Sequence, residues 1–546
     1  MGSQIHHVEL TLLILVALVA LLAVFAQKLK TPYPIILVLG GLVLSFFHVI
    51  PHVSLNPTFV FLVILPPLVF ASSLKTTWGE FRANSAMLLM LGLGLVGFTV
   101  AGVAVFAHFV IPGFDWKSGA VLGAVLSTTD VIAVATLATR VGMPHALLSI
   151  IEGESLVNDG TGLLALQFTT AMVVSGAIPT LGEGAGDLIW LILGGIAAGL
   201  LIGWLVSRFD GFLVLRYPGA SELQILVSLV TPYFAYLLGE SVHASGVLAT
   251  LACGLYVGRT APETLSSRAR LDAHAVWNMI DFILNGLVFI LIGLQLPTIL
   301  DGMRPNHGTG PLPWPRMLTE AAVVFGLLIV LRMLWVYPCA YISRWIRVHI
   351  QKRRARRPRP RELVVMAWSG MRGVLALAAA LSLPVITDRG ARFPERETII
   401  FLAFAVILAS LVGQGLTLPW LVRRLRIAEP EATRRDALEA RREMLKFVLR
   451  TLHGIDRTSD EVEAKAVDEL IRIYNQRLHA LSAEARQDGR AQDEALLERK
   501  LRELGAQIRA AQRVELMRLR REGRFRESTL RAIERELDLM ELRWEQ

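Results

Sequence analysis

Long apolar runs dominate the first 425 positions of this 546-residue chain. A membrane-spanning helix needs about 20 mostly apolar residues, because the hydrocarbon core is about 30 Å thick and backbone polar groups must be satisfied inside it. We count about thirteen such runs: 8–26, 32–50, 57–74, 85–111, 118–139, 146–175, 186–207, 221–239, 242–258, 275–297, 317–343, 362–387 and 396–422. The sequence therefore predicts an all-α polytopic membrane protein with about 13 transmembrane helices.

The short loops between the runs differ in charge. If the loops are taken alternately, the set with "KTTWGEFR" and "SRWIRVHIQKRRARRPRPR" holds about nineteen Lys and Arg residues, and the other set about six. Cytoplasmic loops carry the positive excess. We therefore expect a multi-pass protein of the cell (inner) membrane, with the N-terminus outside and the C-terminal tail in the cytoplasm. This bias also explains the net charge of +9 without a nucleic acid partner.

The composition changes after residue 425, which separates an expected transmembrane domain (1–425) from a tail (426–546). The tail is dense in charge and spaces Leu, Ile and Val helically, as in "EVEAKAVDELIRIYNQRLHALSAEA". This pattern predicts three to five short amphipathic cytoplasmic helices, with Gly454, Gly489, Gly505 and Gly523 between them. Two roles stay open for the tail: a packing or dimer-stabilising appendage, and a regulatory domain.

Polar residues interrupt the sixth run, in "EGESLVNDGTG". An ionisable group in mid-membrane costs roughly 3 kcal/mol or more and usually marks a pathway or a buried pair. Ser155 and Asp159 share one helix face, and Glu154 and Asn158 share another about 100° round. We interpret Asp159 as a transport residue, because it lies deep in the run with no cation near it in sequence.

Two other runs carry polar centres. The fifth contains "VLSTTDVIAV", with Thr129 and Asp130, where hydroxyls beside an acid can unwind a helix and free carbonyl oxygens. The twelfth contains "WSGMRGVLALAAAL", in which Gly370 and Gly373 flank Arg372 and indicate another irregular helix centre. The sequence thus predicts two interrupted helices.

Several charges have a plainer interpretation. Glu154 is expected to form a structural ion pair with Arg332 or Arg372, rather than to bind an ion. We interpret Glu152 as a solvated carboxylate near a helix end and Asp281 as an ordinary residue one turn inside a cytoplasmic end.

Five stretches, taken in order, carry a resemblance to a known family: "LSTTDVIAVATL", "EGESLVNDGTGLLAL", "FILNGLVFILIGLQLP", "SGMRGVLALAAAL" and "LVGQGLTLPWL". Together they resemble the monovalent cation/proton antiporters, in the branch of the eukaryotic sodium/proton exchangers and their bacterial relatives. The resemblance covers about residues 8–425. It implies a thirteen-span fold with two inverted six-helix repeats, a homodimer, and a core in which two interrupted helices cross.

The resemblance also assigns roles to positions in this chain. It places Thr129 and Asp130 at the crossing on the fifth span, Gly370 to Gly373 at the crossing on the twelfth, and Asn158 with Asp159 at the ion site. Arg332 is then the favoured partner of Glu154, because Arg372 falls at the crossing. One departure concerns the third span, where many relatives carry an acid and this chain has Ala71 and Ser72.

The expected function is secondary active transport, with Na⁺ exchanged for H⁺ by alternating access in pH and sodium homeostasis. Asp159, Ser155 and Thr129 are the expected Na⁺ ligands. A single titrating carboxylate beside Asn158 indicates an electroneutral 1:1 cycle. No cofactor and no enzymatic activity are expected. Li⁺ and K⁺ remain alternative cations, so a K⁺/H⁺ antiporter is the second candidate.

Two other classes of protein are possible. Asp130 and Asp159 could form the dyad of an intramembrane aspartyl protease, but such proteases carry a Gly-x-Gly-Asp stretch and here "LVN" precedes Asp159. A channel would need a filter-like repeat or a charged ring, and the sequence shows neither.

Overall fold

The structure is a computed structural model. It describes residues 2–46, 57–176, 181–217, 221–303, 314–350, 352, 358–427, 431–454 and 461–486, together with isolated positions between 500 and 533. The chain forms two compact units, residues 1–428 and 429–546. Within the described residues every regular element is a helix, apart from one isolated bridge between Ile386 and Arg392.

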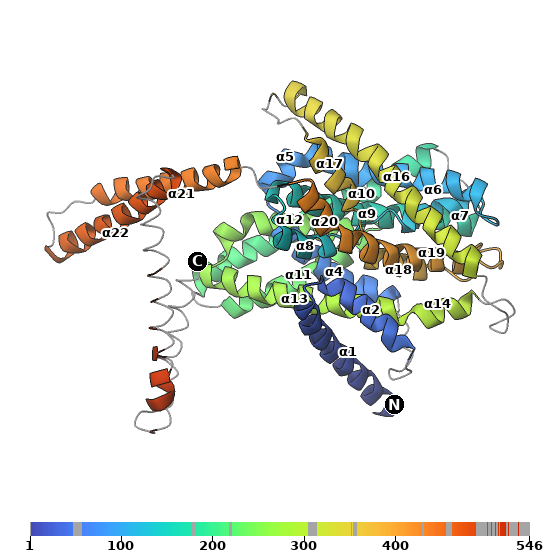
Figure 1. The fold of residues 1–546 in the computed structure, drawn as a ribbon, viewed down its shortest axis with the longest axis horizontal. Coiled ribbons are helices and arrows are strands. Elements are labelled where there is room, and N and C mark those ends of the chain that lie inside the picture. Colours follow the sequence, from blue (N-terminus) through green and yellow to red (C-terminus); the bar gives the residue numbers. More distant parts are fainter. Residues whose placement is uncertain are drawn as a thin grey trace. The chain divides into compact units, whose positions relative to one another are not determined.

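The helices of the first unit follow the predicted apolar runs (Figure 1). They are α1 (Gly2–Lys28), α2 (Tyr33–Ser45), α3 (Pro57–Phe59) with η1 (Val60–Ile64) and α4 (Leu65–Lys75), α5 (Trp78–Leu89) with η2 (Met90–Gly94) and α6 (Leu95–Val110), α7 (Trp116–Val125), α8 (Ile132–Val141), α9 (His145–Ser175), α10 (Leu181–Arg216), α11 (Ser221–Ser241), α12 (Gly246–Thr264), α13 (Ser267–Leu294), α14 (Leu296–Gly302), α16 (Trp314–Trp345) with η3 (Ile346–Ile350), α17 (Pro360–Trp368), α18 (Val374–Leu381), and α19 (Arg396–Ala409) with η4 (Ser410–Gln414) and α20 (Gly415–Arg424).

Seven of the helices in the described part of the chain are long and apolar enough to cross a membrane. A polytopic membrane protein is therefore what the structure supports, and the total of about 13 spans stays a prediction. The last residues of the second predicted run, 47–50, lie outside the described residues.

Two predicted runs fold as pairs of short helices with a break between them. In the first break, between α7 and α8, Ser127 Oγ donates to the Ala124 carbonyl oxygen at 2.7 Å, so a side chain takes over a backbone acceptor. Asp130 Oδ1 then accepts the backbone N–H of Ile132, the first residue of α8, at 2.8 Å. The second break, between α17 and α18, holds Gly370 and Gly373.

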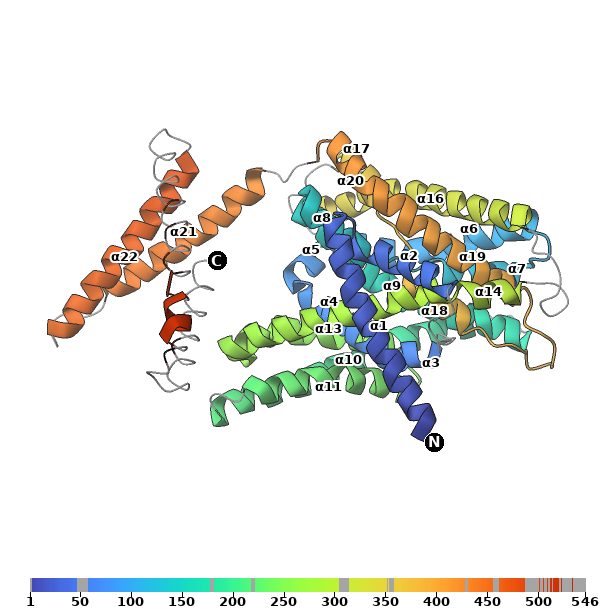
Figure 2. The same cartoon turned by 60° about the horizontal axis from the view of Figure 1, so that its bottom comes forward.

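The helices of the first unit pack as two groups, and α11 and α13 of one group lie side by side in the lower part of Figure 2. One group contains α1, α2, α4 and α10 to α13, and the other contains α5 to α9 and α16 to α20. Close approach within the first group depends on glycine. A Cβ on Gly41 of α2 or on Gly293 of α13 would collide with the backbone of the other helix.

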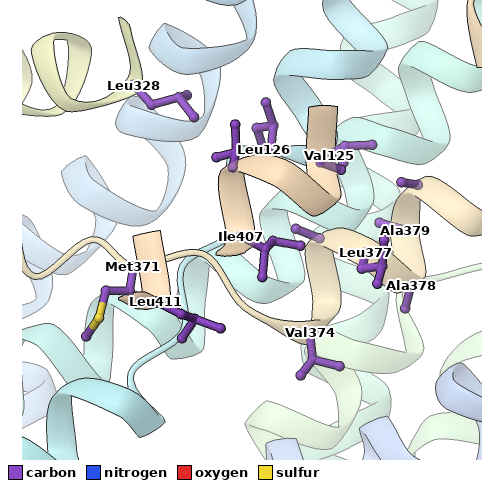
Figure 3. Close-up of a cluster of buried hydrophobic side chains, with 14 of the residues drawn as sticks. Val125, Leu126, Leu328, Met371, Val374, Leu377, Ala378, Ala379, Ile407 and Leu411 are labelled. Atoms are coloured by element: carbon purple, nitrogen blue, oxygen red, sulfur yellow. The ribbon is translucent and has the colours of Figure 1, made fainter. Parts of the chain in front are cut away.

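A cluster of fully buried apolar side chains surrounds the two breaks (Figure 3). Val125 and Leu126 come from the end of α7, Met371 from the second break, and Ile407 and Leu411 from α19 and η4. Between transmembrane helices, van der Waals packing and interhelical hydrogen bonds stabilise such an arrangement. The cluster thus positions the two breaks against each other.

The second unit contains α21 (Glu431–His453) and α22 (Glu461–Arg486), which lie side by side in Figures 1 and 2. Leu449, Leu452 and Val467 are its buried apolar side chains within these two helices. Both helices are longer than the short ones expected, and α21 ends at His453, directly before Gly454. Gly489, Gly505 and Gly523 lie outside the described residues.

Candidate cation site at the helix crossing

A cavity of about 370 Å³ lies between the two helix groups of the first unit. Its wall on one side contains Thr129 and Asp130 of the first break, Gly373 of the second, and Ser155 and Asp159 of α9. Its wall on the other side contains Tyr33, Ser72, Lys75, Asp281 and Asn285, from α2, α4 and α13. The cavity therefore joins carboxylates and hydroxyls that are far apart in the sequence.

The two breaks meet at one wall of this cavity. The Asp130 backbone N–H donates to the Met371 carbonyl oxygen at 2.7 Å, which links one interrupted helix to the other. A Cβ at position 373 would collide with the Asp130 carboxylate, so only glycine leaves that carboxylate its present place. The side chain of Asp130 is thus fixed by the start of α8 on one side and by Gly373 on the other.

Ser155 and Asn158 of α9 hold the unwound backbone at Thr129. Ser155 Oγ donates to the Thr129 carbonyl oxygen at 2.7 Å, and Asn158 Nδ2 donates to Thr129 Oγ1 at 2.6 Å. Because the Ser155 hydroxyl donates its hydrogen to that carbonyl oxygen, the lone pairs of Ser155 Oγ remain free to bind a cation in the cavity. Ser155 lines the cavity, whereas Asn158 does not. Asn158 Oδ1 also accepts the Thr129 backbone N–H at 3.4 Å, so this amide contacts both the side chain and the backbone of Thr129.

Asp159 lines the cavity, and one of its carboxylate oxygens lacks a hydrogen bond from the described residues. Its Oδ1 is buried, and no hydrogen-bond donor among the described residues reaches it; the same holds for Thr128 Oγ1. An ionised carboxylate is costly to bury without a partner. A proton or a cation bound at Asp159 Oδ1 would offset that cost.

Glu154 lies on the other face of α9 and pairs with Arg332 of α16. Arg332 Nη2 donates to Glu154 Oε2 at 2.9 Å, Nη1 contacts Oε1, and the two side chains are 3% and 1% exposed. Arg332 also donates to the carbonyl oxygens of Ala367, at 3.0 Å, and Met366, at 3.1 Å. The structure thus places the favoured partner, Arg332, against Glu154, and the guanidinium binds α9 to the end of α17.

Arg372 is buried at the second break and contacts no carboxylate at ion-pair distance in the described part of the chain. Its Nη1 lies 3.4 Å from the Gly370 carbonyl oxygen, and its backbone N–H donates to Ser410 Oγ at 3.0 Å. Position 372 therefore belongs to the crossing, as the resemblance implies, and the structure does not bring its side chain to Glu154.

The far wall holds Lys75 and Asn285, which the sequence does not single out, and Asp281, which was expected to be an ordinary residue near a helix end. Lys75 Nζ lies 2.7 Å from Asp281 Oδ2, Asn285 Nδ2 donates to Asp281 Oδ1 at 2.7 Å, and these side chains line the cavity together with Glu152. The spacing of Asp281 and Asn285, four apart on a helix, indicates a polar stripe. Nothing local in the sequence shows that this stripe faces Asp159.

Comparison with known proteins places the chain among transporters. The family model described as sodium/hydrogen exchanger, transmembrane, matches residues 14–424. An uncharacterized Na⁺/H⁺ exchanger of Mycobacterium tuberculosis is 33% identical over 538 residues, which cover 97% of this chain and 96% of the relative. A sodium, potassium, lithium and rubidium/H⁺ antiporter of Bacillus pumilus is 32% identical over 496 residues, which cover 89% of this chain and 72% of the relative.

The fold is similar to a solved structure as well. The sodium proton antiporter MjNhaP1 from Methanocaldococcus jannaschii superposes with a TM-score of 0.56 at 18% identity, over 77% of this chain and 99% of that one. That identity supports the fold alone. The named relatives are antiporters and exchangers, not enzymes. From the match over residues 14–424, the chain belongs to the sodium/hydrogen exchanger family of membrane transporters.

Proposed function

We propose that this protein exchanges Na⁺ for H⁺ at a site centred on Asp159. The observation that carries the proposal is the buried Asp159 Oδ1, which faces the cavity and receives no donor from the described residues. A carboxylate oxygen is a hard ligand that binds either a proton or an alkali cation. Because both occupy the same group, binding of one releases the other.

The remaining Na⁺ ligands come from the crossing and from α9. Ser155 Oγ and Thr129 belong to the same wall as Asp159, and the Ser155–Thr129 hydrogen bond orients the serine lone pairs. Thr128 Oγ1 adds an oxygen that has no partner among the described residues. Oxygen-only ligand sets of this kind suit hard cations.

Asp130 has a different role in the proposal. Its carboxylate accepts the first free N–H of α8 and lies at the glycine that precedes α18, so two helix N-termini stabilise its negative charge. Asp130 therefore stays ionised and attracts cations without exchanging protons. Asp159 is then the group that binds and releases a proton in each cycle, and one Na⁺ exchanges for one H⁺.

Transport follows from the two helix groups on either side of the cavity. In repeat-fold transporters one bundle moves against the other around a site near the bilayer midplane. We propose the same motion here, with two inverted six-helix repeats, a homodimer, an outside N-terminus and a cytoplasmic tail. No cofactor takes part, because the ion gradients supply the free energy.

The cation is open to a second candidate. One relative is named for sodium, potassium, lithium and rubidium exchange. K⁺ is therefore the alternative substrate of the same site, and a K⁺/H⁺ antiporter is the alternative function. An intramembrane protease receives no support, because the family model that matches residues 14–424 describes a sodium/hydrogen exchanger.

The test uses purified protein in liposomes that enclose a pH-sensitive dye. A pH gradient is imposed, and NaCl, LiCl, KCl or choline chloride is added outside. We expect Na⁺ to collapse the gradient and choline to leave it unchanged. The proposal is wrong if none of the three alkali cations moves protons, or if the cations cross at the same rate without an opposing pH gradient, as in a channel.

A further inference from the structure

A single basic side chain faces the cation site. Among the described residues that line the cavity, Lys75 is the only Lys or Arg, whereas Asp130, Glu152, Asp159 and Asp281 contribute four carboxylates. Lys75 is the last residue of α4, on a face that also brings Ser72 to the cavity. Its ammonium carries the same charge as the transported ion.

The ammonium is held on the wall by Asp281 of α13. Lys75 Nζ lies 2.7 Å from Asp281 Oδ2, and the side chains are 39% and 27% exposed. Asn285, which is buried, donates Nδ2 to Asp281 Oδ1 at 2.7 Å. Both oxygens of Asp281 are thus engaged, and its orientation is set by a buried neighbour one turn along the same helix.

The flexible partner in this pair is the lysine. A lysine carries its charge on a four-carbon stem with several rotatable bonds, whereas an aspartate has one methylene. If Asp281 did not hold it, the ammonium would be drawn to the other carboxylates that line the same cavity, because they carry the opposite charge. It would then occupy the place of the transported cation.

We propose that Asp281, oriented by Asn285, is a positioning residue that keeps the Lys75 ammonium away from Asp159 and Asp130. The pair thereby sets the cation concentration at which the transporter works. This inference rests on the proposed function. The alternative is that the Lys75–Asp281 pair only links α4 to α13. In that case its removal would lower the stability of the protein, but the ammonium would not compete with Na⁺.

The test measures Na⁺-driven proton movement in proteoliposomes as a function of Na⁺ concentration. We expect Asp281→Asn to raise the half-saturating Na⁺ concentration about tenfold, because the freed ammonium competes for the carboxylates. The maximal rate at saturating Na⁺ should persist. In Lys75→Gln/Asp281→Asn the competitor is absent, so half-saturation should return to within about twofold of the wild type.

Three outcomes overturn the inference. They are unchanged half-saturation in Asp281→Asn, an increase that Lys75→Gln does not cancel, and a fall in maximal rate with unchanged half-saturation. A wild type without cation-driven proton movement overturns the proposed function as well. If the wild type exchanges ions and Asp281→Asn has the same half-saturating Na⁺ concentration, only this inference is overturned.

Two further variants keep the test decisive. If Asp281→Asn is not recovered folded, Asn285→Ala removes only the orienting amide. Half-saturation should then rise by a smaller factor, and Lys75→Gln should again cancel it; no rise overturns the inference. The matched control is Glu320→Gln. It breaks the ion pair in which Arg316 Nε lies 2.7 Å from Glu320 Oε1, and neither residue lines the cavity. The half-saturating Na⁺ concentration should stay unchanged.

Discussion

Glu154 and Asp159 are carboxylates of the same helix, yet their surroundings differ in one respect. Glu154 has the guanidinium of Arg332 against it, and Asp159 Oδ1 has no donor from the described residues. Removing one partner of a buried ion pair leaves the other charge uncompensated, which is strongly destabilising. We therefore propose a structural role for the paired Glu154 and a transport role for Asp159, whose Oδ1 is open to an ion or a proton.

The first prediction concerns Glu154→Gln. The variant leaves the buried Arg332 without its counter-charge, which costs about 3–5 kcal/mol. We expect a marked drop in the midpoint of thermal unfolding in detergent, with little change in the half-saturating Na⁺ concentration of the folded protein. A stable variant with much weaker Na⁺ dependence would show that Glu154 is itself a ligand.

The control for this prediction is an exposed pair of the same unit. Asp272→Asn removes the partner of Arg268, and the two side chains are 50% and 62% exposed. Exposed pairs contribute about 0–1 kcal/mol, so the unfolding midpoint should barely move.

The two stripes of α9 are predictable from the sequence, because residues four apart on a helix share a face. The pair of Lys75 and Asp281 is not, since 206 positions separate them and no local pattern relates them. Long-range pairs of this kind depend on how helices pack, which helical periodicity does not determine.

At the scale of elements, the crossing depends on glycine as well as on hydroxyls. Hydroxyls and an acid in "LSTTDV" and glycines in "SGMRG" are sufficient to predict two irregular helix centres. The contact between them, from the Asp130 N–H to the Met371 carbonyl oxygen, follows from packing. The runs over 118–139 and 362–387 each fold as two short helices, which agrees with the interruptions that the polar residues and glycines predict.

The π-helical segments are a second feature that the sequence does not predict. In η2, Trp335 Nε1 donates to the Met90 carbonyl oxygen at 2.9 Å, and Thr161 Oγ1 donates to the Gly92 carbonyl oxygen at 2.7 Å. These donors come from α16 and α9. A widened turn is stable here because distant side chains satisfy its carbonyls.

The prediction for the crossing is Gly373→Ala. The added methyl group would collide with the Asp130 carboxylate and displace it from the cavity wall. We expect the maximal exchange rate to fall about tenfold or more, since small displacements at a functional centre have large effects on rate. The rate is measured in proteoliposomes with a pH dye.

The matched control is Gly326→Ala in α16. A Cβ at this position meets no atom within 4 Å, so the same chemical change adds no clash. Its exchange rate should equal that of the wild type. Equal rates in Gly373→Ala and the wild type would contradict the role given to the crossing.

At the scale of the whole molecule, the apolar runs predict a polytopic helical protein, and the change in composition near residue 425 lies close to the boundary between units at 428 and 429. What the runs do not predict is the sorting of helices into two groups with a cavity between them. That arrangement depends on close contacts such as Gly41 against Gly293, which composition does not reveal.

The whole-molecule prediction concerns charge per cycle. If Asp159 alone exchanges protons, one Na⁺ replaces one H⁺ and no net charge crosses the membrane. Purified protein adsorbed on a solid supported membrane should therefore give no sustained current on a Na⁺ jump. A sustained current, or a rate that depends on membrane voltage, would show that a second group such as Asp130 also titrates. Asn158→Ala should also give no sustained current, because the asparagine amide neither binds nor releases a proton during the cycle.

The most direct test of the central claim is Na⁺-driven proton movement in proteoliposomes that contain Asp159→Asn. The amide keeps the shape of the side chain but binds neither a proton nor a cation strongly. We predict that the variant elutes as folded protein on size exclusion and moves no protons when Na⁺ is added, while the wild type collapses the same pH gradient. Wild-type rates in Asp159→Asn would contradict the account.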